Sequence, residues 1–165
     1  MIIVSPSLTD WGDKSARQTI ELTNYFIDNF SVDESRIYAA GHSAGGETLS
    51  RVVDMRPDLF ASYLHIASQW DGGYNNVTAY KLPVYIFMGE NDEYYGADKA
   101  REPYNSLYQK YVSEGLSDDE IDNLLVLDLR DNEYFVSHSF NNQHAGGQLA
   151  GNDADIIKWM LSHTK

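Results

Sequence analysis

Residues 36–49, with the sequence RIYAAGHSAGGETL, contain the pattern that decides the fold. The apolar run over Arg36–Ala40 predicts a buried strand, and the small residues that follow begin a helical pattern. Between the predicted strand and the predicted helix lie residues 41–45, GHSAG, which fit the pattern G-x-S-x-G. A tight strand-to-helix turn of this kind strains the serine backbone and projects its hydroxyl outward. Ser43 is therefore a candidate nucleophile.

The residues around Ser43 suit this chemistry. Glycines at 41 and 45 are expected to avoid side chains that would collide with the neighbouring strand and helix. The backbone N–H of Ala44 faces the same space as the serine hydroxyl, at the positive end of the helix, and can donate to an oxyanion. The alternative is a turn rich in glycine and serine that has no chemistry.

The rest of the chain alternates between strand and helix patterns. Further short apolar runs predict buried strands at Met1–Val4, Ser62–Ala67, Pro83–Met88 and Leu124–Leu129. Helical patterns occupy residues 14–30, 44–56, 97–116, 117–124 and 153–165, the last with Ile156, Ile157, Met160 and Leu161 expected to be buried. This alternation predicts an α/β fold, with a mostly parallel sheet of about five strands flanked by helices. A chain of 165 residues is expected to form one domain over 1–165.

Composition excludes several classes of function. The formal net charge of −13, with only 12 lysines and arginines, argues against binding to nucleic acid. There is no cysteine, so disulfides, thiolate metal sites and a cysteine nucleophile are excluded. No stretch approaches the roughly 20 apolar residues of a membrane span, and the first residues lack a signal-peptide pattern. We therefore expect a soluble protein that does not bind membranes, with the cytoplasm as the favoured compartment.

A serine hydroxyl needs a base to take its proton, and usually an acid to orient that base. In folds with this turn the chain order is serine, then Asp or Glu, then histidine. The predicted strand at 83–88 runs into the loop GENDEYYG, where Asp92 is the preferred acid and Glu90 and Glu93 are its rivals. His144 lies in a loop rich in glycine and asparagine before the last helix, and it is the preferred base. A solvated turn and a surface histidine are the alternatives.

The other histidines fit the role of base less well. His138 is the second candidate, six residues before His144. His42 cannot easily bond the adjacent serine, His65 lies within a predicted strand as a core residue, and His163 is expected to be exposed. No histidine pair has the H-x-x-x-H spacing of a helical metal site, so no metal is expected, and no cofactor is implied.

Three stretches together resemble a known group of enzymes. They are IYAAGHSAGGETL, GENDEYYG, and NNQHAGG followed by DADIIKWML. They resemble the α/β-hydrolase superfamily, and more narrowly bacterial esterases related to poly(3-hydroxybutyrate) depolymerases, feruloyl esterases and prolyl oligopeptidase-type catalytic domains. The resemblance runs over nearly the whole chain and implies a partial α/β-hydrolase fold.

By position, the resemblance implies that Ser43 is the nucleophile, Asp92 the acid and His144 the base. It also implies that the Ala44 N–H is one oxyanion donor. Trp70 and Tyr74, in the loop after the third predicted strand, correspond to positions that contact substrate in such enzymes.

The sequence also departs from the family. In the family, several strands and an oxyanion loop of the H-G-G-G type precede the strand that corresponds to the one starting here at Met1. No such loop occurs in this sequence. Relative to the family we therefore expect a chain that is truncated at its N-terminus. Loss of one oxyanion donor typically lowers kcat by about 10²–10³. A strand at Met1 would leave a bare sheet edge, so we expect either a homodimer paired there or a fragment of a longer protein.

The leading hypothesis is a serine esterase that acts on a small-molecule ester through an acyl-enzyme. A serine peptidase on the same fold is the near alternative. A non-catalytic interaction module that retains the triad residues is the alternative from another class.

Overall fold

The computed structural model of the chain, in which residues 2–165 are described, contains one parallel sheet with helices on both faces. Its strands lie in the order β1-β2-β3-β4 and comprise Tyr38–His42, Ser62–Ile66, Val84–Gly89 and Leu125–Arg130. Neighbouring strands are parallel throughout, with Tyr38 opposite Ser62 and Tyr63 opposite Val84. The α/β fold predicted from the sequence is confirmed.

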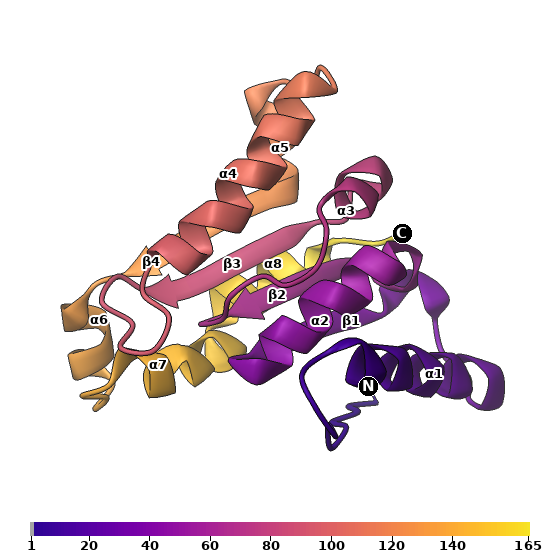
Figure 1. Cartoon of the computed structure of the whole chain (residues 1–165), viewed down its shortest axis with the longest axis horizontal. Helices are drawn as coiled ribbons and strands as arrows, with labels where there is room; N and C mark the ends of the chain where they lie inside the picture. Colours follow the sequence, from indigo (N-terminus) through magenta and orange to yellow (C-terminus); the bar gives the residue numbers. More distant parts are fainter. Residues whose placement is uncertain (1) are drawn as a thin grey trace.

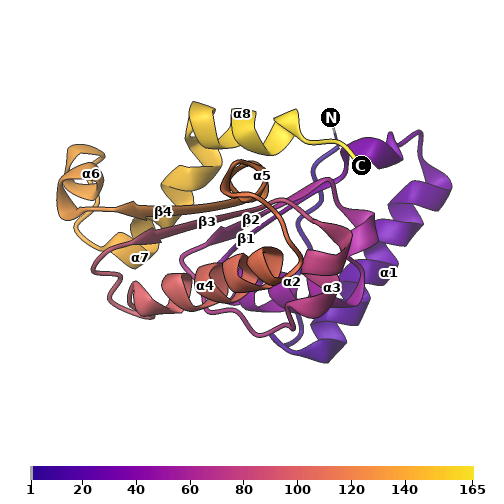
Figure 2. The same cartoon turned by 90° about the horizontal axis from the view of Figure 1, so that it is seen from above.

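The helices divide between the two faces of the sheet. They comprise α1 Asp13–Asn29, α2 Ala44–Met55, α3 Asn75–Tyr80, α4 Asp98–Ser113, α5 Asp118–Leu124, α6 Asn132–Ser137, α7 Gln143–Gly146 and α8 Ala154–Ser162. Figure 2 shows α2, α3 and α4 on one side of the sheet and α8 on the other. Each face accordingly has its own apolar cluster, one around Ile86 and Leu107, the other around Phe87 and Ile156.

Local signals explain several of the element ends. Helix α2 ends at Met55, and Arg56 caps it. Arg56 precedes Pro57, and a residue before proline avoids the helical backbone conformation. Ser117 and Glu120 form the reciprocal bonds of a capping box at the start of α5. The strand predicted at Arg36–Ala40 instead runs over Tyr38–His42, because a 3₁₀ turn at Glu34–Arg36 occupies its first position.

The predicted first strand is wrong over residues 2–4, and within residues 2–165 the sheet has four strands where about five were expected. Ile2, Ile3 and Val4 are irregular and exposed, with Ile3 80% exposed. A strand exists only through hydrogen bonds to a neighbour, and β1 pairs with β2 alone among the described strands. Met1 lies outside the described residues.

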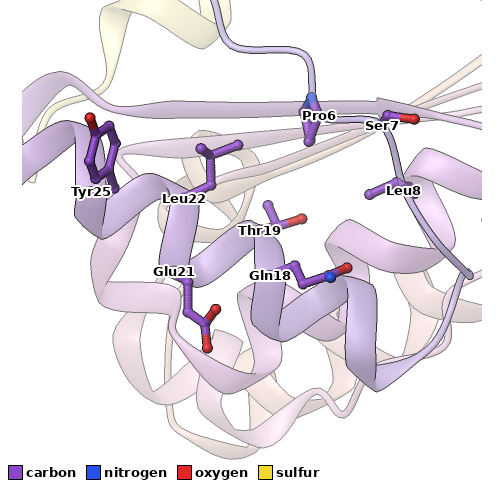
Figure 3. Close-up of a pocket in the computed structure, with 8 residues that line it drawn as sticks. All are labelled: Pro6, Ser7, Leu8, Gln18, Thr19, Glu21, Leu22 and Tyr25. Atoms are coloured by element: carbon purple, nitrogen blue, oxygen red, sulfur yellow. The ribbon is translucent and has the colours of Figure 1, made fainter.

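The N-terminal segment runs beside α1 instead of joining the sheet. Between them lies a hollow of about 500 Å³ (Figure 3), which is lined by Pro6, Ser7, Leu8, Gln18, Thr19, Glu21, Leu22 and Tyr25. Burial of the C-terminal helix is also less than expected: of the four residues expected to be buried, Ile156 alone is buried and the other three are half-buried.

The parallel arrangement brings the loops after β1 and β3 to one edge of the sheet. In Figure 1 the arrowheads of β3 and β4 point toward the side where α6 and α7 lie. The carboxyl ends of parallel strands are where sites form in open α/β sheets. Ser43 directly follows β1 and Asp92 lies in the loop after β3, so both lie at this edge, and His144 belongs to α7, which contacts β3.

Candidate active site

Ser43 occupies the turn between β1 and α2 in a strained backbone conformation. Its φ is 54° and its ψ is −128°, a combination that costs a residue with a side chain about 1–3 kcal/mol. Two hydrogen bonds from the neighbouring strand segment hold it there. The Ser43 N–H donates to the Ile66 carbonyl at 3.0 Å, and the Ser68 hydroxyl donates to the Ser43 carbonyl at 2.7 Å.

The glycines near Ser43 do not all serve the purpose expected of them. A Cβ at Gly41 would lie 2.6 Å from the Gly45 carbonyl oxygen, so this position requires glycine. A Cβ at Gly45 would meet nothing within 4 Å, which contradicts the expected collision there. The second close approach belongs to Gly46, where a Cβ would lie 2.6 Å from the Cβ of Ser68. The helix backbone passes close to the end of β2 at Gly46, and Gly45 faces open space.

Asp92 lies in the loop after β3 and is 6% exposed. Its Oδ1 accepts the backbone N–H groups of Tyr94 and Tyr95 at 3.0 and 2.7 Å. Its Oδ2 lies 3.0 Å from Nδ1 of His144. An ionised carboxylate only accepts hydrogen bonds, so Nδ1 carries the proton and donates.

The same tautomer leaves Nε2 of His144 as an acceptor. Nε2 lies 3.0 Å from Oγ of Ser43, which can donate its hydroxyl proton to it. The structure therefore brings Ser43, His144 and Asp92 into one hydrogen-bonded relay. The imidazole bridges a hydroxyl and a carboxylate, as a general base and its orienting acid require.

The rival acids and the second candidate base take other positions. Glu90 is exposed, and the Glu93 carboxylate accepts backbone N–H groups of Gln143 and His144 instead of contacting the imidazole. His138 ends α6, and its ring bonds the Tyr134 carbonyl at 2.7 Å. None of these three side chains belongs to the relay.

His65 is a core residue, as its position in a predicted strand indicated. Its Nε2–H donates to the Ser68 carbonyl at 3.1 Å, and its Nδ1 accepts from the Tyr63 hydroxyl at 2.7 Å. Burial lowers the pKa of His65 to about 4, although the bond to Ser68 opposes the shift. The ring is therefore neutral at physiological pH. His163 is partly buried, contrary to the expectation of exposure, because its ring bonds the carbonyls of Trp159 and Asn123.

The remaining candidates differ in what surrounds them. Ala44 is the first residue of α2. At this end of the helix the Gly46 N–H donates a hydrogen bond to the Ser43 carbonyl. The N–H of Ala44 therefore lies before the first hydrogen bond within the helix and has no partner there, as an oxyanion donor requires.

Trp70 and Tyr74 stack on each other with ring centroids 5.7 Å apart, and both pack against the core. Their contact with substrate stays a prediction.

Sequence reasoning missed several residues around the relay. The rings of His42 and Tyr94 each lie 5.2 Å from the ring of His144. The Tyr95 hydroxyl donates to the buried carboxylate of Glu47, one turn into α2. Burial raises the pKa of Tyr95, and the bond to Glu47 raises it further. The signal was the run of residues 92–95, DEYY, every member of which contacts the site or a neighbouring element.

In the described part of the chain, residues 2–165, no three histidine or acidic side chains gather closely enough to hold a metal ion. No helix in that range has both the length and the apolar character to cross a membrane.

Comparisons with known proteins concern the family and the fold of the chain. The sequence profile described as "Prolyl oligopeptidase family" matches residues 7–151. A curated relative, "Probable aminopeptidase YbaC" from Bacillus subtilis (strain 168), is 35% identical over 65 residues, which are 39% of this chain and 20% of that protein.

Solved structures share the fold. A thermostable esterase superposes with a TM-score of 0.76 at 19% identity, over 97% of this chain and 42% of the esterase. Est1E from Butyrivibrio proteoclasticus gives a TM-score of 0.62 at 14% identity, over 90% of this chain and 69% of Est1E. Oligopeptidase B from Leishmania major gives 0.59 at 14% identity, over 93% and 24%. The chain thus spans less than half of the thermostable esterase and contains part of the α/β-hydrolase fold.

Proposed function

The chain belongs to the prolyl oligopeptidase family, and from this premise we propose that it is a serine hydrolase that cleaves carboxylic esters through an acyl-enzyme. The observation that carries the proposal is the relay from Asp92 through His144 to Ser43, with both hydrogen bonds at 3.0 Å. The strained backbone of Ser43 supports the same role, because strain of this kind is concentrated at functional sites.

Each member of the relay has a defined task in the proposed reaction. Ser43 Oγ attacks the acyl carbon while Nε2 of His144 takes the hydroxyl proton. Asp92 keeps the imidazole in the required tautomer and stabilises the imidazolium that forms. The proton then passes to the leaving alkoxide, and a water molecule hydrolyses the acyl-enzyme by the same steps. The Ala44 N–H donates to the oxyanion of each tetrahedral intermediate.

A peptidase is the second candidate, favoured by the description of the family and by the aminopeptidase relative. We place ester hydrolysis first because the acyl carbon of an ester is intrinsically more reactive toward a hydroxyl nucleophile than that of an amide. The Ala44 N–H is the oxyanion donor that this proposal assigns. Further donors are typically worth about 10²–10³ in kcat each, and an ester depends on them less than an amide does.

A fluorophosphonate probe tests the proposed nucleophile directly. We expect the probe to modify Ser43 alone, as mapped by peptide mass spectrometry, and the Ser43→Ala variant to remain unlabelled. Ser113→Ala is the matched control, because Ser113 is an exposed serine on α4 and its loss should leave labelling unchanged.

Turnover then distinguishes the two substrate classes. Short p-nitrophenyl esters are expected to be hydrolysed faster than a peptide p-nitroanilide, because the acyl carbon of an ester is intrinsically more reactive toward a hydroxyl nucleophile than that of an amide. The reverse order would make the protein a peptidase. A folded chain that is not labelled at all would favour the non-catalytic interaction module.

A further inference from the structure

The backbone of His144 is held by two side chains that adjoin the other members of the relay in sequence. His42 immediately precedes Ser43, and its Nε2–H donates to the His144 carbonyl at 2.9 Å. Glu93 immediately follows Asp92, and its carboxylate accepts the N–H of His144 at 3.0 Å and that of Gln143 at 3.0 Å. Both backbone polar groups of the candidate base are therefore held by hydrogen bonds, one from the last residue of β1 and one from the loop after β3.

These ties matter because little regular structure supports this part of the chain. His144 belongs to α7, which has only four residues and continues into a 3₁₀ segment at Gly147–Asn152. A segment of this kind makes no ladder bonds with the sheet, and such segments open locally more easily than core strands. Hydrogen bonds from side chains to its backbone hold this segment in place where strand pairing is absent.

Packing around His42 supports the same conclusion. Its ring centroid lies 5.2 Å from that of His144, with the ring planes 33° apart. A Cβ at Gly147 would lie 3.0 Å from the His42 ring, so the chain after α7 passes directly against this imidazole. His42 thus fixes the position of the His144 ring as well as the direction of its carbonyl.

Glu93 is suited to its task because it is charged. Burial raises its pKa, but the N–H groups of His144 and Gln143 outweigh that effect and hold the pKa below its ordinary value. A hydrogen bond to an ionised acceptor is stronger than one between neutral groups. The carboxylate therefore holds the start of α7 with two such bonds.

We propose that His42 and Glu93 are positioning residues that hold His144 within hydrogen-bond reach of Ser43 and Asp92 at the same time. The proposal rests on the hydrolase function proposed above. Its physical reason is that the imidazole must satisfy two distances at once, and a displacement of about 1 Å can cost about 10²-fold in rate. Neither residue is assigned contact with substrate.

Kinetics of four variants test the proposal. His42→Leu and Glu93→Ala are expected to lower kcat and kcat/KM by about 10- to 100-fold with KM unchanged, because the base acts only in the transition state. His42→Gln keeps an N–H donor at similar reach and should recover most of the lost rate. Glu90→Ala is the matched control, since Glu90 is an exposed carboxylate in the same loop. A rise in KM alone would overturn the proposal.

Hydrogen exchange provides a readout that does not depend on activity. In the Glu93→Ala variant the amides of Gln143 and His144 should exchange at least about 10-fold faster, while amides in β2 and β3 keep their protection. Unchanged exchange at these two amides would overturn the proposal even if kcat fell. A wild-type chain that no fluorophosphonate labels would remove the proposed function, and the exchange rates would still decide whether Glu93 holds α7.

Discussion

The edge of the sheet that carries Ser43 and the flank formed by residues 2–12 and α1 differ in how their side chains are used. At the site edge, polar side chains such as Asp92, Glu47 and Gln143 are buried, and each makes a hydrogen bond to a distant segment. At the flank, large apolar side chains remain in solvent, with Trp11 61% and Tyr25 55% exposed. Polar groups are thus buried where they are paired, and apolar groups are exposed where nothing in the described chain covers them.

The difference teaches what an apolar pattern can and cannot establish. The apolar residues of α1, which include Ile20, Leu22 and Phe26, recur at helical spacing. An apolar stripe of this kind ordinarily faces a core. In the structure α1 packs against α2 and buries only Ser15 and Ala16 fully. Periodicity identifies which face of a helix is apolar. Whether that face is covered depends on what else is present.

The largest effect is expected at the site edge from Asp92→Asn. An asparagine can offer its amide N–H to the imidazole and so stabilise the wrong tautomer, which leaves Nε2 unable to accept the serine proton. We expect kcat for a p-nitrophenyl ester to fall about 10⁴-fold. Glu90→Gln, a matched loss of a carboxylate in the same loop, should change kcat less than twofold. Equal losses in the two variants would contradict the assignment of Asp92.

The second prediction compares two glycines in the turn at Ser43. Gly41→Ala forces a Cβ to 2.6 Å from a backbone oxygen, and we expect a loss of about 3 kcal/mol or more in the free energy of unfolding. Gly45→Ala meets no neighbour and should be neutral or stabilising by up to about 1 kcal/mol, since alanine favours the helix. Urea unfolding at fixed pH measures both. Similar losses for the two variants would show that the turn is not shaped by this contact.

Much of the site could be predicted because its chemistry imposes order on the sequence. A serine in G-x-S-x-G, an acid after a strand and a histidine before the last helix are local patterns, and parallel strands must deliver them to one edge. The choice of Asp92 over Glu93 also followed from position. What Glu93 does instead could not be predicted, because its partners are backbone N–H groups 50 and 51 residues away.

The errors in the fold have the same cause. The run at residues 1–4 has the composition of a strand, but a strand needs a paired neighbour, and pairing is a property of the assembled sheet. Gly45 was assigned a collision that belongs to Gly46, because one residue along a helix turns the side chain by about 100°. Local patterns therefore identified the elements, while long-range contacts decided which of their residues are covered.

The third prediction concerns the dependence of stability on pH at the buried His65. The unfolded ring takes up a proton below its ordinary pKa of 6.5, whereas the folded ring does so only near pH 4. Between these values the unfolded state binds more protons, so stability falls as pH is lowered and the loss is complete below pH 4. The full effect is about 3 kcal/mol, of which about 2 kcal/mol is lost by pH 5.

Comparison with a His65→Gln variant isolates this contribution. Urea unfolding at pH 7 and at pH 5 gives, for each protein, the change in the free energy of unfolding between the two pH values. All other titrating groups are the same in both proteins, so they contribute equally to both changes. We expect the wild-type protein to lose about 2 kcal/mol more than the variant over this interval. Identical losses would mean that the ring is solvated or already charged in the folded state.

The smallest effect is expected at the flank, where Ile3→Ser should change the free energy of unfolding by less than about 0.5 kcal/mol, because Ile3 is 80% exposed. Ile86→Ala is the contrasting variant, since Ile86 is fully buried and its truncation should cost about 2–5 kcal/mol. The homodimer, one of the two alternatives expected from the sequence, makes a different prediction for the same flank. If a second copy covers the flank, or pairs with the edge of β1 that meets no other described strand, Ile3→Ser would weaken association, and sedimentation would detect a shift toward the monomer. A loss of stability that grows with protein concentration would assign Ile3 to an interface and remove the contrast between the two regions.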